Sequence, residues 1–170
     1  MGFLNWFADE NTKNRDIAKA GFEKAAASGD SKELKALRVR VAMRCKTGLD
    51  MIFRMAMRAT ENHAEEVMIA LASGETPPPE PIADADTCFL SSPTTNGPVV
   101  IYIPPEFASK FFELGVNFQK GDIDKEKAIA DGQALAEELS NILNLGQSMV
   151  QPITPLEFLL SENQEDQESD

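Results

Sequence analysis

The chain has 170 residues, of which 42% are hydrophobic and 26% charged, values that exclude wholesale disorder and suit a single domain. Residues 1–76 contain 12 Lys and Arg against 11 Asp and Glu, whereas residues 77–170 contain 4 against 17, and together they give a formal net charge of −12. This acidic balance opposes non-specific binding to nucleic acid or to an anionic membrane by the molecule as a whole.

The first part of the chain is predicted to be helical. Residues 3–27 form a helix that Gly29 closes, and Asp30 or Ser31 begins the next helical segment. Residues 32–73 contain no proline, and their apolar residues recur at spacings of three and four, which is typical of one buried face. Because Gly48 or the residues 62–63 could interrupt this segment, the sequence is compatible with one long helix or with two.

An arginine stripe lies opposite the apolar face of residues 32–73. On a helical wheel Arg40 and Arg58 coincide, and Arg44 and Arg54 lie on either side of them. Arginine favours bidentate contact with carboxylate or phosphate. Residues 32–58 contain eight basic residues and two acidic ones, so local acids cannot neutralise the stripe. We expect its counter-charges to come from the acidic half of the same fold, or from a partner.

Apolar residues also lie among these basic ones. Met43, Phe53 and Met57 fall off the main apolar face, and a helix that is apolar on two sides is either buried on both or offers one to a partner. Methionine is common at adaptable binding surfaces, so the three are candidate contact residues. The favoured alternative is the central helix of a bundle, in which methionine simply fills the core.

Proline-rich residues 74–81 predict an extended linker. After it, residues 87–90 and 99–103 are predicted strands of a β-hairpin. A helix over residues 105–120 follows, and the next helix begins at Asp122 or Asp124 and keeps its apolar spacing as far as Met149.

The C-terminal end contains a further candidate. Residues 155–161 are predicted to form a short helix, in which Leu156, Leu159 and Leu160 could dock in a groove or pack on the protein's own core. Residues 161–170 are acidic and predicted to be disordered.

No motif indicates a reaction. His63 is the only histidine, and neither a nucleophile elbow nor a phosphate-binding loop is present. The two cysteines, Cys45 and Cys88, form no pattern for a metal site or a disulfide framework and are expected to be small buried residues. We therefore expect no enzymatic activity, cofactor or metal. With no secretory signal and no membrane-length apolar run, a soluble cytoplasmic protein is expected.

The sequence thus predicts a mainly α-helical bundle with a small β-hairpin after a proline-rich linker. Residues 1–76 are the basic helical segment, 77–98 the linker and start of the hairpin, and 99–160 the helical segment that completes one domain. The expected function is a non-enzymatic protein–protein interaction module, such as an adaptor, a chaperone-like protein or a regulatory subunit, that associates with itself. The alternative is an acidic inhibitor or nucleic-acid mimic that captures a basic partner. Binding of nucleic acid by the arginine stripe is disfavoured by the net charge and the low aromatic content.

Overall fold

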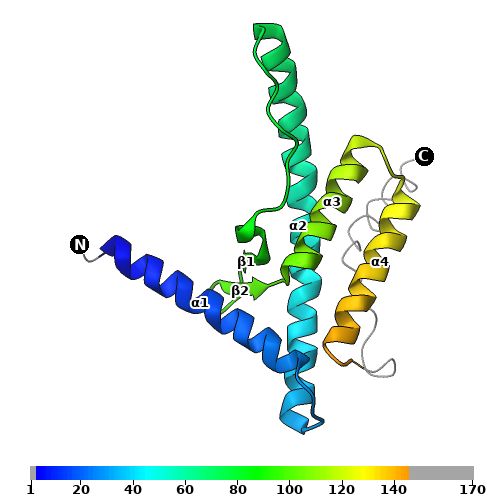
Figure 1. The fold of residues 1–170 in the computed structure, drawn as a ribbon. Coiled ribbons are helices and arrows are strands. Elements are labelled where there is room, and N and C mark those ends of the chain that lie inside the picture. Colours follow the sequence, from blue (N-terminus) through cyan, green and yellow to red (C-terminus); the bar gives the residue numbers. More distant parts are fainter. Residues whose placement is uncertain (1–2, 146–170) are drawn as a thin grey trace.

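The computed structural model describes residues 3–145, with side chains from residue 10 onward, and is mainly α-helical with one small antiparallel hairpin (Figure 1). This confirms the predicted fold class. The elements in chain order are α1 (Phe3–Ala26), α2 (Lys32–Ser73), the 3₁₀ turn η1 (Ala85–Cys88), β1 (Phe89–Ser92), β2 (Val99–Tyr102), α3 (Pro105–Lys120) and α4 (Lys125–Ile142).

Helix α2 is one continuous helix of 42 residues, and is therefore about 63 Å long. Ser31 begins it, because the Ser31 hydroxyl accepts a hydrogen bond from the Leu34 amide at 3.1 Å, and Gly74 ends it with φ 71°. Gly48 does not interrupt the helix. It is buried beneath β2, where an added Cβ would lie 2.9 Å from Ile101, so the glycine allows the hairpin to pack closely on α2.

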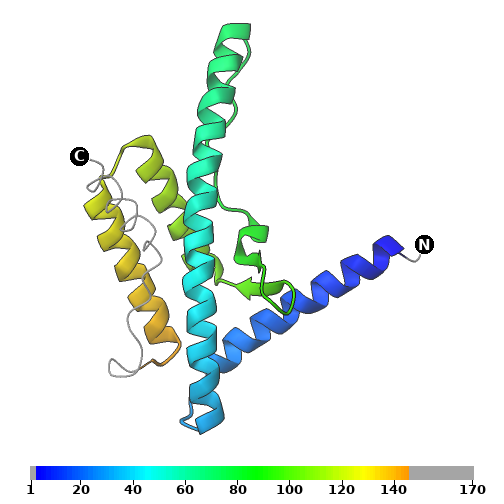
Figure 2. The ribbon, with the colours of Figure 1, turned by 180° about the vertical axis from the view of Figure 1, so that it is seen from behind.

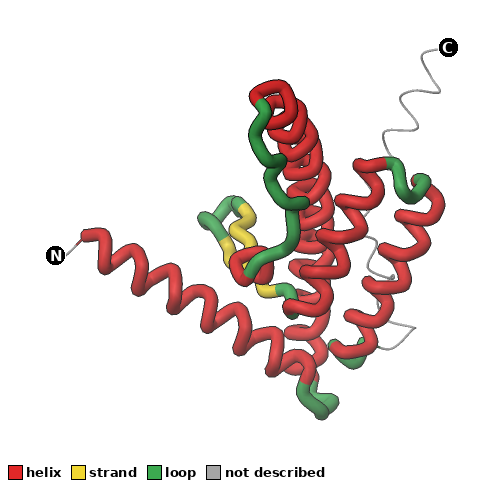
Figure 3. The backbone as a smooth tube through the Cα atoms, turned by 45° about the horizontal axis from the view of Figure 1, so that its top comes forward, coloured by secondary structure: helices red, strands yellow, loops and turns green. Residues whose placement is uncertain are grey.

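The other elements pack around α2. Helices α3 and α4 lie on one side of it, and α1 and the hairpin lie on the other (Figures 1 and 3). The linker that follows α2 runs back along its upper end, where the His63 Nε2 donates to the Pro78 carbonyl oxygen at 3.1 Å. Among the described residues, no helix is both long and apolar enough to cross a membrane.

The hairpin begins two residues later than predicted. Residues 87 and 88 belong to η1, because Asp84 and Thr87 form a capping box in which the Thr87 amide donates to Asp84 at 3.0 Å. Strand β1 then pairs with β2 so that Phe89 faces Tyr102 and Ser92 faces Val99. Cys88 therefore lies in the 3₁₀ turn, not in a strand.

Helix α4 is shorter than predicted. Asp124 caps its start by accepting from the Lys127 amide at 2.8 Å, as expected. The helix ends at Ile142, because Asn144 adopts a left-handed conformation with φ 53° and donates its side-chain amide to the Ala26 carbonyl at 3.0 Å. This contact joins the end of α4 to the end of α1. Met149 lies outside the described residues.

Helices α2 and α3 approach each other closely at Gly115. At Gly115 an added Cβ would lie 2.7 Å from the Ala56 Cβ and 2.7 Å from the Phe53 carbonyl oxygen. Because one of these atoms is backbone, a side chain at this position would push the two helices apart.

Replacing Gly115 by Ala should destabilise the protein by about 1–3 kcal/mol, the usual range for overpacking a tight core contact. The measurement is the free energy of unfolding in urea. Gly21 is a matched control, because an added Cβ there meets nothing within 4 Å, so Gly21→Ala should cause no loss. Equal effects of the two substitutions would contradict the close contact.

Candidate interaction surface on α2

One face of α2 is left uncovered by every other described element over most of its length (Figure 2). Exposed side chains recur on this face at spacings of three and four, so they form one continuous surface. We call this surface the open face of α2. Its exposed members are Arg40, Met43, Arg44, Thr47, Arg54, Met55, Arg58, Glu61, Asn62, Glu65, Met68, Ile69 and Ala72.

The four predicted arginines all lie exposed on the open face. The Arg54 guanidinium pairs with the Asp50 carboxylate one turn earlier, at 3.2 Å. Arg40, Arg44 and Arg58 contact no carboxylate among residues 10–145. Within the described part of the chain, the guanidiniums of these three therefore have no counter-charge.

The acidic half of the fold does not supply the expected counter-charges within the described part of the chain. Its carboxylates pair largely with the lysines of the same half: Glu80 with Lys120 at 2.8 Å, and Asp131 with Lys127 at 3.1 Å. The expectation that this half neutralises the arginines was wrong for these residues. The reason is position, because α3 and α4 lie behind and to one side of α2, away from the open face (Figure 2).

The upper end of the open face is acidic. Glu61 accepts a long hydrogen bond of 3.4 Å from Gln119 at the end of α3. Glu65 and the neighbouring Glu66 are exposed and contact no cation in the described chain. The open face thus has two regions of opposite charge, with arginines toward the N-terminal end of α2 and glutamates toward its C-terminal end.

Like charges are repeatedly placed one turn apart on this face. Arg54 precedes Arg58 by four residues, and Glu61 precedes Glu65 by four. Such pairs destabilise an isolated helix by about 0.2–0.5 kcal/mol each. Interspersed signs would stabilise α2 as a lone helix, so the segregated order is better suited to contact with another charged surface.

Apolar side chains also lie on or beside the open face. Met43 is 65% exposed, Met68 73% and Ile69 66%. Leu71, on the adjoining face of the same upper end, is 65% exposed. Apolar area of this extent, rimmed by charged residues, is typical of an interaction surface.

Two of the predicted contact residues are placed differently. Phe53 is fully buried between α2, α3 and α4, with its ring 5.7 Å from that of Phe118, so its assignment to an interaction surface was wrong. Met57 is half-buried and packs on the same cluster. The wheel placed both residues off the main apolar face, but α4 adds a second packed side to α2. Leu156, Leu159 and Leu160 lie outside the described residues.

Sequence reasoning missed the role of Arg38, which was counted as one more base in residues 32–58. Arg38 is 5% exposed and donates three hydrogen bonds to the end of α1, to the carbonyl oxygens of Ala25 at 2.9 Å, Ala27 at 2.6 Å and Gly29 at 2.8 Å. Ala25 lies in the last turn of α1, where carbonyls lack intrahelical partners and a cation is favourable, and Ala27 and Gly29 lie in the turn that follows. The signal available in the sequence was its position on the apolar side of the wheel, away from Arg40 and Arg58.

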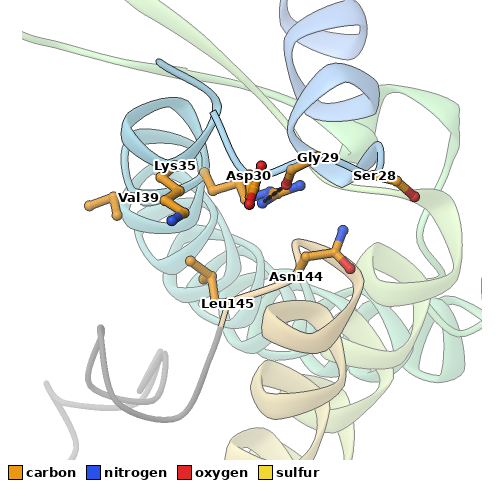
Figure 4. Close-up of a pocket in the computed structure, with 8 residues that line it drawn as sticks. Ser28, Gly29, Asp30, Lys35, Val39, Asn144 and Leu145 are labelled. Atoms are coloured by element: carbon orange, nitrogen blue, oxygen red, sulfur yellow. Dashed lines mark hydrogen bonds between the residues drawn. The ribbon is translucent and has the colours of Figure 1, made fainter. Parts of the chain in front are cut away.

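A pocket of about 430 Å³ lies where the α1–α2 turn meets the residues after α4 (Figure 4). Its polar lining includes Asp30, Lys35 and Asn144. Arg38 also lines it, but its guanidinium is held by the carbonyls of α1. The chain continues from this pocket into residues that the structure does not describe.

The cysteine and histidine side chains of the described chain are buried or hydrogen-bonded within the fold. Burial raises the pKa of the Cys45 thiol to about 12, which makes it a poor nucleophile at neutral pH. Burial also raises the pKa of Cys88. His63 is held by the linker carbonyl rather than by neighbouring glutamates. Within residues 10–145 no cluster of three or more His, Cys, Asp or Glu side chains could hold a metal ion.

Comparison with known proteins gives no relative: no protein-family model matches the chain, and no curated protein or solved structure is significantly similar to it.

Proposed function

We propose that this protein is a non-enzymatic protein–protein interaction module that associates with itself through the open face of α2. The observation that carries the proposal is found on one uncovered helix face: Arg40, Arg44, Arg58 and Glu65 contact no opposite charge among residues 10–145, and methionine and isoleucine side chains are exposed beside them. Surfaces with complementary charge and an apolar component support specific association.

The alternative of an acidic inhibitor is less well supported by the packing. It depends on the carboxylates of residues 122–138 and of the acidic tail. The tail lies outside the described residues, and several carboxylates of residues 122–138 already have intramolecular roles. Asp122 pairs with Lys120 at 3.5 Å, Asp131 pairs with Lys127 at 3.1 Å, and Asp124 caps α4. Fewer carboxylates therefore remain to face a basic partner.

Self-association should be visible by sedimentation velocity and should weaken with salt. At about 0.05 M salt the weight-average mass should rise with protein concentration, because the Debye length is then about 14 Å and facing charges are only partly screened. At about 1 M salt, where the Debye length is about 3 Å, the association should be much weaker. A monomer at every concentration and salt would contradict self-association, and association that strengthens with salt would contradict its charged character.

A further inference from the structure

The open face of α2 follows a regular repeat. Its central residues alternate spacings of four and three, an average of 3.5, so they form one continuous strip along which a second helix can lie. The residues at these positions are Arg40, Arg44, Thr47, Met51, Arg54, Arg58, Glu61, Glu65, Met68 and Ala72. All are exposed except Met51, which is half-buried.

This repeat has an internal symmetry about a point between residues 59 and 60. At equal distances from that point, Arg58 corresponds to Glu61 and Arg54 to Glu65, so each base is matched by an acid. Farther out, one methionine corresponds to another, and a small residue to a small one. The matched outer positions are Met51 with Met68 and Thr47 with Ala72.

From this symmetry we propose that a second copy of the chain packs its α2 antiparallel against the open face, with a two-fold axis beside residues 59 and 60. In this register Arg58 of each copy faces Glu61 of the other, and Arg54 faces Glu65. This inference rests on the proposed self-association, and adds the orientation and the register of the two copies. An isologous contact of this kind closes on itself and gives a dimer.

The register pairs the exposed charges at its centre, whereas Arg40 and Arg44 lie opposite positions beyond the end of the partner copy's α2. Arg58 and Glu65, which contact no opposite charge among the described residues, would each gain one, and Arg54 can keep its Asp50 partner. A parallel pair in register would instead place arginine against arginine and glutamate against glutamate, which is strongly unfavourable.

The packing of the rest of the molecule is compatible with this arrangement. The hairpin, α1, α3 and α4 all contact α2 away from the open face (Figure 2). The two bodies would therefore lie on opposite sides of the paired helices. The contact would be held by charged pairs flanked by Met51 and Met68, which makes it sensitive to salt.

A charge-swap experiment tests the register. Arg54→Glu with Arg58→Glu makes the centre of the face wholly acidic, and Glu61→Arg with Glu65→Arg makes it wholly basic. Each doubly substituted chain alone should lose self-association by about 100-fold or more, because like charges then face each other. An equal mixture of the two should restore a dimer that contains one copy of each, because every facing pair is again opposite in sign.

Matched substitutions on other helices distinguish an effect of the register from an effect of the net charge. Lys13→Glu with Lys19→Glu on α1, and Glu137→Arg with Glu138→Arg on α4, change the net charge by the same amounts at exposed positions. These variants should associate like the wild type. Restoration in the mixture would itself show that both swapped chains are folded. If the wild type associates but the swapped chains do so equally well, or if the mixture stays monomeric, the register is overturned while self-association stands.

Disulfide trapping gives an independent reading of the orientation. A chain with Thr47→Cys mixed with a chain with Ala72→Cys should form a covalent dimer under mild oxidation, since a disulfide requires Cα atoms within about 7 Å. Thr47→Cys alone should not. The native Cys45 and Cys88 are buried, so the wild type is the control for background. Crosslinking of Thr47→Cys with itself, in place of the mixed product, would overturn the antiparallel arrangement.

Discussion

Substituting Arg38 by Met is expected to destabilise the protein by about 3–5 kcal/mol. The guanidinium makes three hydrogen bonds of 2.6–2.9 Å to carbonyls of the last turn of α1 and of the α1–α2 turn, and methionine can make none of them. The carbonyl oxygens of Ala25, Ala27 and Gly29 would then lack this donor where α1 meets α2. Urea unfolding followed by circular dichroism measures the change.

Arg40 provides the matched control, because it is the same residue two positions later and lies exposed on the open face. Arg40→Met should change the free energy of unfolding by less than about 0.5 kcal/mol. If the two substitutions are equally mild, Arg38 does not hold α1. A partial transition in which α1 alone loses protection from proteolysis would locate the loss at this junction.

Phe53→Ala is expected to cost about 3–5 kcal/mol, the usual range for truncating a buried phenylalanine. Phe53 is fully buried, where it packs with Leu114 and Ala128 and contacts the ring of Phe118. The substitution would leave a cavity between three helices that cannot all move to fill it. Thermal or urea unfolding measures the loss.

Met43→Ala is the control for Phe53, because Met43 also lies on α2 but is 65% exposed. It should leave the free energy of unfolding nearly unchanged. The two substitutions therefore distinguish a core residue from a surface residue, although the sequence alone assigned both to the same candidate surface. A small effect at Phe53 would mean that α4 does not pack on α2 as described.

Much of the fold could be predicted because its signals are local. Ser31, Gly74, Pro105, Gly121 and Asp124 mark helix ends through capping geometry that depends on a few neighbouring residues.

The features that could not be predicted depend on contacts between distant segments. Gly48 was a possible helix break, and only the approach of Ile101 explains why a glycine is tolerated there within a continuous helix. Asn144 ends α4 through a left-handed turn and a contact with Ala26, although the apolar spacing continues beyond it.

The candidate surface could be predicted only in part, because its extent also depends on contacts between distant segments. A helical wheel places Arg40, Arg44, Arg54 and Arg58 on one face correctly, because helix geometry alone decides which residues share a side. It cannot say which sides other helices will cover. Phe53 was therefore misplaced, since α3 and α4 enclose it.

The order of charges along α2 has a consequence for the molecule's electric field. The bases lie toward the N-terminal end of a helix about 63 Å long and the glutamates toward its C-terminal end. This order has the same sense as the dipole of the helix backbone, which is positive at its N-terminus. The two add, so α2 is a strong dipole, and in the proposed dimer the two dipoles would oppose each other, which favours the antiparallel order at low salt.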